Sequence, residues 1–553
     1  MKQILFVLCL AQKALAAQQF LLGNAFEQPN TLLREPSIQS AVHDITSVLN
    51  AVLADSSTQF NQSIGNETAV SVRIVSVHDE KPLLDFHHTP TALNLSAGSV
   101  AKIDADSMYR IGSISKLFTV YSLLVNHGSD ILDKPVTDFV PELEAAAAAA
   151  ADDASAVDAV RWREVTVGAL ASQLAGLARD FSRIEFFEGF LARHPVVLPC
   201  TTPVYSNAAF RILAYILESF AKKPFQDVIT ESVFRPLGLG RSATVRPQKH
   251  SVGVIPAGDS GWFRSIGNET ATAGFFSSSR DLAEFGRSIL AHRQLTAVET
   301  RRWMKPSAHT SSLSFSVGAP WEIWRTGSRV TSGYTTDLYT KSGSDGLYNA
   351  LLVLAPDTGV VISVLAAGTD SSAMLTAGAE TAVQGLLPIL DDVSRMQACR
   401  KYCGTYSNAE TNSSLIIAAG GYSNGTEEED GPGIVVTKWT SRGKDIMATA
   451  QAYADSTGSG GITSFKLYPS IAEHEATRTA YRLIFATRAP GYTQGASPPP
   501  PRIFDPIAGA WGAVDQLTYG RVAVDEFIFH LDQHGNSAQS VELGALRQTL
   551  FRV

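Results

Sequence analysis

The chain is poor in cysteine and has no surplus of positive charge. Its 553 residues include four cysteines, and 45 Lys and Arg are outnumbered by 53 Asp and Glu, which gives a net charge of -8. Proteins that bind nucleic acid through its phosphates carry a basic surface. Nucleic acid is therefore not an expected partner.

The few cysteines are not spaced as metal ligands. Cys9 lies in the N-terminal segment, and no histidine flanks Cys399 and Cys403 at the spacing of a zinc ligand set. We therefore expect no metal site. Cys399 and Cys403 are near enough to form a local disulfide, but a bridge from Cys200 to either is equally open. One of these three is left free or paired with another chain.

Long hydrophobic runs are absent after the N-terminus. A membrane-spanning helix needs about 20 consecutive apolar residues. The richest candidate, residues 351–367, contains Pro356, Asp357 and Gly359. This stretch is typical of two strands joined by a turn, so we expect no membrane span.

The N-terminus itself has the pattern of a secretory signal. Lys2 precedes an apolar run at residues 4–11, and the small residues at 14–17 suit cleavage after Ala16 or Ala17. We predict a signal peptide at residues 1–17 and a secreted protein; a buried N-terminal helix is the alternative. Six N-x-S/T sequons favour a glycoprotein of a eukaryotic secretory pathway. They lie at Asn61, Asn66, Asn94, Asn268, Asn412 and Asn424.

The rest of the composition is that of a globular protein with an ample core, since 45% of the residues are hydrophobic and 18% are charged. The length predicts two or more domains. Apolar periodicity predicts helices at 37–53, 166–177, 206–221 and 281–293 and strands at 70–78, 81–86, 338–341, 348–354 and 359–366. Strands at both ends of a helical middle suggest a sheet whose first and last parts come together.

The sequence pattern changes at about Cys399. Short alternating runs are separated there by turns rich in Gly, Ser and Asn. This pattern predicts an all-β barrel or sandwich. We therefore divide the mature chain into a mixed α and β domain at 18–396 and an all-β domain at 397–553.

Ser113 and Lys116 form an S-x-x-K pair at the start of a predicted helix. Side chains three positions apart lie on one face of a helix, so the amine can reach the hydroxyl. The helix N-terminus adds free backbone N–H groups and positive potential. A weak nucleophile, a base and an anion site are what acyl transfer needs. On its own the pair is weak, because a solvated lysine on a helix explains it as well.

Two further patterns follow in order. Tyr205 and Asn207 stand two residues apart before a helix; the hydroxyl can relay a proton, and the amide can contact a substrate and orient a lysine. Lys341 precedes Ser342 and Gly343 at a strand end, where Gly343 lets a substrate approach the backbone and a strand N–H can bind an oxyanion. Each alone has an ordinary explanation: the first is a helix start in which Asn207 caps and Tyr205 packs, and the second is a strand end with a solvated Lys341.

The ordered set S-x-x-K, Y-x-N and K-S-G resembles the serine β-lactamase and penicillin-binding-protein superfamily, in its class C β-lactamase, DD-peptidase and esterase branch. The sequence around residues 109–119, 203–210 and 272–283 is similar to that family as well. The resemblance spans roughly residues 35–395. It implies an α+β fold, an antiparallel sheet flanked by helices with an all-helical subdomain. Secreted fungal members often carry a C-terminal β-domain.

The resemblance implies a role for each motif residue. Ser113 would be the nucleophile, with Lys116 and Tyr205 sharing the role of base. The backbone N–H groups of Ser113 and Ser344 would form the oxyanion hole. No metal or organic cofactor is needed, and the expected substrate is a small-molecule ester, amide or lactam.

The remaining motif residues would handle the substrate. Asn207, Lys341, Ser342 and Gly343 would bind and position it. The third motif departs from the Thr-Gly form, but Ser342 keeps the hydroxyl. The stretch 169–177 replaces the L-L-x-H-T-S-G-L of many relatives, which bears on local packing.

The sequence thus predicts a secreted serine hydrolase of the esterase, amidase or weak β-lactamase type. An acyltransferase of secondary metabolism on the same fold is one alternative. A catalytically silent binding glycoprotein that kept the fold is the other.

Overall fold

The computed structural model describes residues 23–54, 67–91, 93–150, 157–180, 186–248, 252–327, 335–420, 422–423, 426–427, 433–457, 461–470, 477–487 and 514–553. The predicted signal peptide at 1–17 and the sequons at Asn61, Asn66 and Asn424 lie outside these residues. Asn94 is partly buried and caps a short helical turn, and Asn412 is exposed.

The contacts within the chain divide it into two units. One, the sheet unit, comprises residues 30–326 and 337–386; the other, the barrel unit, comprises residues 1–29, 327–336 and 387–553. The division at 386/387 falls inside helix α13, Ser371–Tyr402. The boundary drawn from the sequence at 396/397 lies in the same helix.

The sheet unit is built on an eight-stranded sheet with the order β2-β1-β10-β9-β8-β7-β6-β5. The strands are β1 Ala69–Ser76, β2 Leu84–His88, β5 Ala308–His309, β6 Phe315–Val317, β7 Glu322–Thr326, β8 Thr336–Asp345, β9 Tyr348–Ala355 and β10 Val360–Ala367. β1 pairs along its whole length with β10 in antiparallel register, from Ala69 opposite Ala367 to Ser76 opposite Val360. The predicted meeting of the first and last strands is confirmed.

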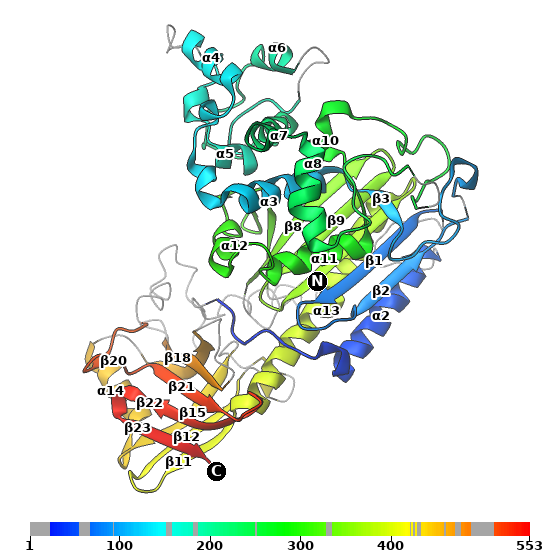
Figure 1. The fold of residues 1–553 in the computed structure, drawn as a ribbon. Coiled ribbons are helices and arrows are strands. Elements are labelled where there is room, and N and C mark those ends of the chain that lie inside the picture. The colour runs from blue at the N-terminus through cyan, green and yellow to red at the C-terminus, as the bar shows by residue number, and fades with distance from the viewer. Residues whose placement is uncertain are drawn as a thin grey trace, which may run out of the picture. The chain divides into compact units, whose positions relative to one another are not determined.

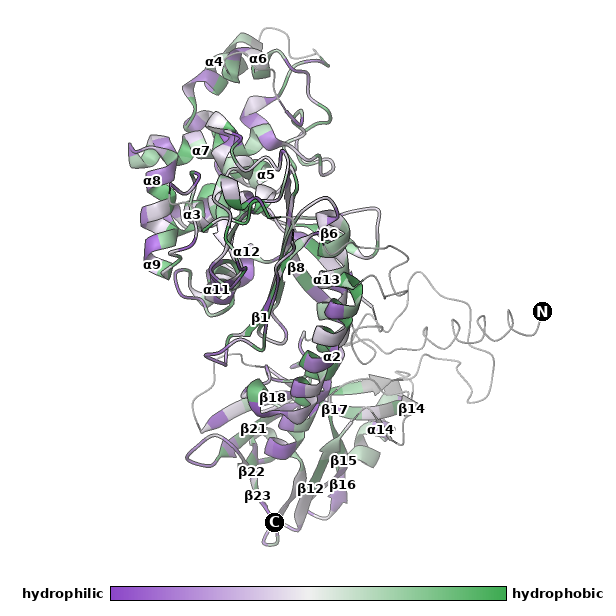
Figure 2. Ribbon diagram, turned by 90° about the vertical axis from the view of Figure 1, so that its right-hand side faces the viewer, coloured by the Kyte–Doolittle hydropathy of each residue, from purple (hydrophilic) through white to green (hydrophobic). Residues whose placement is uncertain are grey.

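Helices cover both faces of this sheet, which is why every residue of β1 and β10 is buried. Figure 2 shows α11, Ser279–Leu290, on one face and α2, Pro36–Leu53, with the first half of α13 on the other. The helices pack closely because glycines face the strands. A Cβ on Gly286 of α11 would lie 2.6 Å from Val361, and one on Gly378 of α13 would lie 3.2 Å from Val364.

A helical subdomain follows β3, Met108–Arg110, and surrounds α3, Ser115–His127 (Figure 1). The first ten residues of α3 are all buried. Phe118 stacks on Phe285 at 3.9 Å and meets Phe234 and Phe275 at 5.6 Å. A helix that is buried all round is a core element, so its N-terminus is held in a fixed place.

The helix predicted at 166–177 is shorter than expected. Helix α5 runs only over Val167–Ala171, and Gln173 and Gly176 take positive φ angles of 63° and 67°. A left-handed residue ends a helix, and the chain then turns toward α7, Asn207–Ala221. The predicted helices at 206–221 and 281–293 correspond to α7 and α11.

The barrel unit confirms the predicted β-domain and settles its type. The strands are β11 Gly404–Asn408, β12 Ser413–Ala419, β15 Ile434–Ser441, β17 Ile462–Pro469, β18 Arg478–Thr487, β21 Glu526–Leu531, β22 Ala538–Leu543 and β23 Gln548–Arg552. They follow the order β12-β11-β23-β22-β21-β18-β17-β15, and β12 also pairs with β15. That last pairing closes the sheet into a barrel. One helix, α14 at Ile446–Thr457, accompanies the strands.

The first described residues of the chain belong to this barrel. Ala25 and Phe26 are buried in its core together with Tyr402. The carboxylate of Glu27 accepts hydrogen bonds from the hydroxyl of Tyr402 at 2.5 Å and from the ammonium of Lys401 at 3.0 Å. Residues 25–27 therefore fold with the C-terminal domain, which the sequence did not predict.

The cysteines take one of the arrangements left open by the sequence. A disulfide joins Cys399 in the last turn of α13 to Cys403, the residue directly after that helix, and Cys200 is free and exposed.

Among the described helices, α13 alone is long and apolar enough to pass a length and composition test for a membrane span. In its apolar window 44% is buried, and its glycines contact β10 and α2.

Candidate functional site

The turn η4, Gly112–Ile114, places Ser113 immediately before α3. Gly112 has a φ of 50°, and a Cβ there would lie 2.5 Å from the backbone nitrogen of Ser344. Only glycine fits this crossing. The hydroxyl of Ser115 donates to Gly112 O at 2.7 Å and accepts from Phe275 N at 3.0 Å, which fixes the turn from behind.

Lys116 lies one turn after Ser113 and is fully buried. Its ammonium donates to Ser113 Oγ at 3.0 Å, Asn207 Oδ1 at 2.8 Å and Thr272 O at 2.7 Å. Burial lowers the pKa of Lys116 well below its usual range, because the charged form is disfavoured away from water. The positive charge of Lys341 lowers this pKa further.

Tyr205 approaches Ser113 from the segment before α7. Its hydroxyl donates to Ser113 Oγ at 2.8 Å, so Ser113 contacts two predicted base groups. The ammonium groups of Lys116 and Lys341 lie 5.0 and 5.6 Å from the Tyr205 ring centre. Ser206, rather than Asn207, caps α7 by accepting from Ala209 N, which leaves the Asn207 amide free to face Lys116.

The strand β8 brings the third motif to the same place. Lys341 is buried and donates to Glu322 Oε1 and to Ser342 O, while Glu322 Oε2 accepts from Ser342 N at 2.8 Å. A Cβ on Gly343 would overlap the carbonyl oxygen of Ile111 and lie 2.8 Å from Ser113 N. The backbones of β8 and η4 therefore cross in contact, next to the backbone nitrogens of Ser113 and Ser344.

A buried ion pair fixes this crossing. Arg110, the last residue of β3, donates to Asp345 Oδ2 at 2.7 Å and to Trp262 O at 3.1 Å, and Arg264 also contacts Asp345. Both Arg110 and Asp345 are almost fully buried. Removing one partner of such a pair is strongly destabilising. The pair thus holds the end of β8 against the segment that leads into Ser113.

The structure brings together all five side chains predicted from the motifs, and it adds four groups that the motifs did not contain. Glu322 contacts Lys341, the Thr272 carbonyl contacts Lys116, Asp180 accepts from Asn207, and Gln173 contacts the segment of Tyr205. Gln173 lies within the stretch 169–177 that departs from the family pattern, and Asp180 follows it by three residues. That departure was the signal that could have found them.

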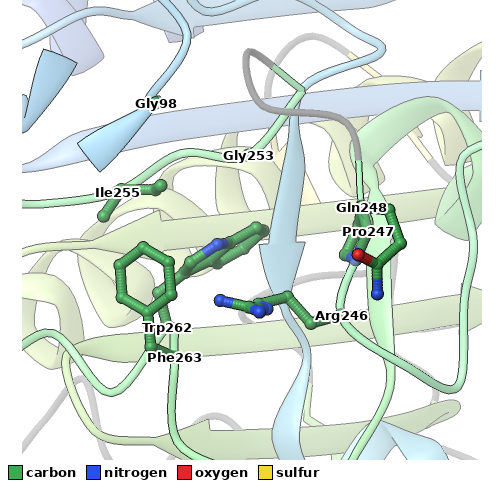
Figure 3. A pocket seen from close by; sticks show the side chains of 8 residues that line it. All are labelled: Gly98, Arg246, Pro247, Gln248, Gly253, Ile255, Trp262 and Phe263. Atoms are coloured by element: carbon green, nitrogen blue, oxygen red, sulfur yellow. The ribbon is translucent and has the colours of Figure 1, made fainter. Parts of the chain in front are cut away.

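A small cavity lies near the Arg110 anchor rather than at Ser113 (Figure 3). Its volume is about 60 Å³, and Trp262 forms part of its wall. The guanidinium of Arg246 lies 4.9 Å from the ring centre of Phe263 at its edge. None of the five motif side chains lines this cavity, so it is separate from the predicted site.

Two family models match the chain. The model described as Beta-lactamase matches residues 65–385, which is more than half of the chain. The model described as Beta-lactamase-like-like, C-terminal domain, matches residues 394–553.

Individual proteins are similar over most of the length. A Beta-lactamase-like protein of Arthroderma benhamiae is 26% identical, covering 96% of this chain and 95% of its own. Probable hydrolase M10 of Phoma sp. is 21% identical, covering 89% and 86%. Among solved structures, a Beta-Lactamase/D-Alanine Carboxypeptidase from Pseudomonas syringae is 17% identical, covers 64% of this chain and 100% of its own, and has a TM-score of 0.49.

Proposed function

Because this chain belongs to the β-lactamase family and has that family's fold joined to a C-terminal β-barrel, we propose that it is a serine hydrolase. The proposed substrates are small esters or amides, and the proposed intermediate is an acyl-enzyme on Ser113. The observation that carries the proposal is the environment of one hydroxyl. Ser113 Oγ lies 3.0 Å from the Lys116 amine and 2.8 Å from the Tyr205 hydroxyl.

The partners of Lys116 support its role as the first base. Asn207 Oδ1 and Thr272 O can only accept hydrogen bonds. A neutral amine would direct its two N–H groups to them and its lone pair to Ser113 Oγ. The lowered pKa of Lys116 favours this neutral form.

In the proposed reaction, Ser113 Oγ attacks the substrate carbonyl carbon as its proton passes to Lys116. The resulting oxyanion is stabilised by the backbone N–H groups of Ser113 and Ser344. The C–O or C–N bond then breaks, and the leaving group takes a proton through Tyr205. Water attacks the acyl-enzyme by the reverse relay and restores Ser113. Asn207 and Lys341 position the substrate.

The proposal is tested with Ser113→Ala. Loss of the nucleophile in a serine hydrolase lowers kcat by about a million-fold, so turnover of p-nitrophenyl esters should disappear. Intact mass after treatment with a fluorophosphonate should show one adduct on the wild type and none on the variant. Equal ester hydrolysis by both proteins would overturn the assignment. An unlabelled, inactive wild type would instead indicate a silent scaffold.

We also propose that the protein is secreted. The signal-like pattern at residues 1–17 and the six sequons support this, and the Cys399–Cys403 disulfide suits an oxidising compartment. Expression in a eukaryotic secretion host should give a product in the medium that begins at residue 17 or 18. Its mass should fall on treatment with an N-glycosidase. Retention of the uncleaved chain inside the cell would contradict the proposal.

A further inference from the structure

Two adjacent charged residues outside the motifs lie against the predicted site. We propose that Arg179 and Asp180 are positioning residues for the reaction: Asp180 holds the Asn207 amide in the orientation that accepts from Lys116, and Arg179 places a positive charge beside the Tyr205 ring. This inference rests on the proposed function, and it assigns the pair a role in the proton transfer from Ser113.

The chain from Gln173 to Asp180 wraps the segment that carries Tyr205. Gln173 O accepts from Val204 N at 2.8 Å, and its side-chain oxygen accepts from Ser206 N at 2.7 Å. Tyr205 is therefore fixed on both sides by a single residue. The backbone oxygen of Arg179 then accepts from Asn207 N at 2.8 Å. The side chains of the two proposed residues are thus presented at Tyr205 and Asn207.

Asp180 and Lys116 hold the Asn207 amide from its two ends. Asp180 Oδ1 accepts from Asn207 Nδ2 at 2.7 Å, while Asn207 Oδ1 accepts from Lys116 at 2.8 Å. A carboxylate can only accept, and an ammonium can only donate. The amide therefore has one orientation that satisfies both neighbours. Lys116 and Asp180 thus select the same orientation, and without Asp180 the Asn207 Nδ2 group would lose its charged acceptor.

Arg179 places a positive charge beside the ring of Tyr205. Its guanidinium lies 5.1 Å from the Tyr205 ring centre and 3.3 Å from the Asp180 carboxylate. Both side chains are more than half exposed, so their electrostatic effect is moderated by water. The two residues are adjacent in sequence and carry opposite charges. Removing one charge or the other should therefore have opposite effects on Lys116, which makes the two variants controls for each other.

Five charged groups face Lys116 from the surrounding elements. They are Lys341 on β8, Glu322 on β7, Arg179 and Asp180 after α5, and Glu269 in the turn before α10. Lys341 and Arg179 lower the pKa of Lys116, and Glu322 and Asp180 raise it. Lys341 and Glu322 are bound to each other within the site. Arg179 and Asp180 are exposed, so replacing either side chain leaves no cavity in the core.

The test compares three variants in the hydrolysis of p-nitrophenyl acetate as a function of pH. The acid limb of kcat/KM reports the pKa of the base in the free enzyme. Asp180→Asn keeps a hydrogen-bond acceptor but removes the negative charge, so the acid limb should move to lower pH. Arg179→Gln removes a positive charge, so it should move to higher pH. Each shift of the acid limb should be about 0.3 to 0.5 pH unit, because the charge that is removed is exposed to water.

Asp180→Ala separates the hydrogen bond from the charge. It should show the same shift as Asp180→Asn and in addition lose about tenfold in kcat, the lower range for a hydrogen bond to a charged group. Asp180→Asn should keep most of that rate. The exposed ion pair of Arg163 with Glu144 in the same unit is the control. Arg163→Gln and Glu144→Gln should leave the acid limb of kcat/KM in place.

The outcomes distinguish this inference from the function on which it rests. Hydrolysis that persists in Ser113→Ala overturns the proposed function. Hydrolysis that depends on Ser113 but whose acid limb is unmoved, or moves the same way in Arg179→Gln and Asp180→Asn, overturns the inference alone. The rate of fluorophosphonate labelling of Ser113 should follow the same shifts, since it needs the base but no deacylation.

Discussion

The sheet unit and the barrel unit use shielded polar groups for different purposes, Lys116 being fully buried and Glu27 partly buried. In the sheet unit, Lys116 has three acceptors around its ammonium, one of which is the hydroxyl of Ser113. In the barrel unit, Glu27 is surrounded by donors from Tyr402 and Lys401 and anchors the first described residues. The first arrangement directs a base at a hydroxyl, and the second holds a chain end. Changes in one should alter chemistry, and changes in the other should alter stability.

The largest expected effect tests the sheet unit. Lys116→Met replaces a buried amine by an apolar side chain of similar length and removes the base. General-base catalysis contributes about 10² to 10⁴ in rate, and we expect a loss near the top of that range in kcat for p-nitrophenyl acetate. The barrel should unfold at the same temperature as in the wild type. Retention of more than a tenth of kcat would show that Tyr205 alone can serve as the base.

The next effect tests the barrel unit. Phe26 is buried in the barrel core, and Phe26→Ala should lower the free energy of unfolding of that unit by about 3 kcal/mol, because removing a buried aromatic side chain leaves a cavity. Thermal unfolding followed by near-ultraviolet circular dichroism measures the change. Activity at a temperature well below the transition should be unaffected. A lowered kcat in Phe26→Ala at that temperature would show that the barrel unit affects the chemistry as well as the stability.

A third prediction concerns a buried charge of the sheet unit that lies outside the site. Burial raises the pKa of Asp281 to about 6, although its carboxylate accepts from Arg241 N and the Ser242 hydroxyl. The unfolded pKa is near 3.9. The contribution of Asp281 to stability is therefore present below about pH 4 and is lost as pH rises through 6.

Asp281→Asn keeps the acceptor and has no charge to bury, so its advantage over the wild type should grow between pH 4 and 6. It should reach about 3 kcal/mol at pH 7. Unfolding in urea at pH 4, 5, 6 and 7 measures this trend. If kcat is unchanged in Asp281→Asn, a buried charge in the sheet unit is not by itself part of the chemistry. The contrast with Lys116 would then be sharper. A constant difference at all four pH values would contradict the pKa assignment.

The parts of the fold that the sequence predicted are those with a local signal. Helical periodicity over residues 37–53 gave α2, and the interruption at Pro356 gave the turn between β9 and β10. Gln173 was predicted to lie in a helix because periodicity continues to Leu177. Its left-handed conformation depends on contacts with residues 204 and 206, which periodicity does not contain.

The candidate site divides in the same way. Ser113 and Lys116 are close in sequence, so their contact follows from helix geometry. Arg110 and Asp345 are far apart in sequence, and each reads alone as an ordinary charged residue. Glu322 likewise contacts the K-S-G motif only because β7 lies beside β8 in the sheet. Closure of the barrel through β12 and β15 was also unpredictable, because alternation defines strands but not their partners.

The smallest expected effect examines the anchor of the barrel. Glu27→Gln keeps the size of the side chain but removes its charge, so the Lys401 ion pair and the charge assistance to the Tyr402 hydroxyl are lost. We expect the barrel to lose about 1 kcal/mol, the ordinary value of a partly buried hydrogen bond. Glu410→Gln, at an exposed glutamate of the same unit, should have no effect and serves as the control. Equal stability of both variants would mean that Phe26 alone holds the N-terminal segment, because burial of its ring would then account for the whole attachment.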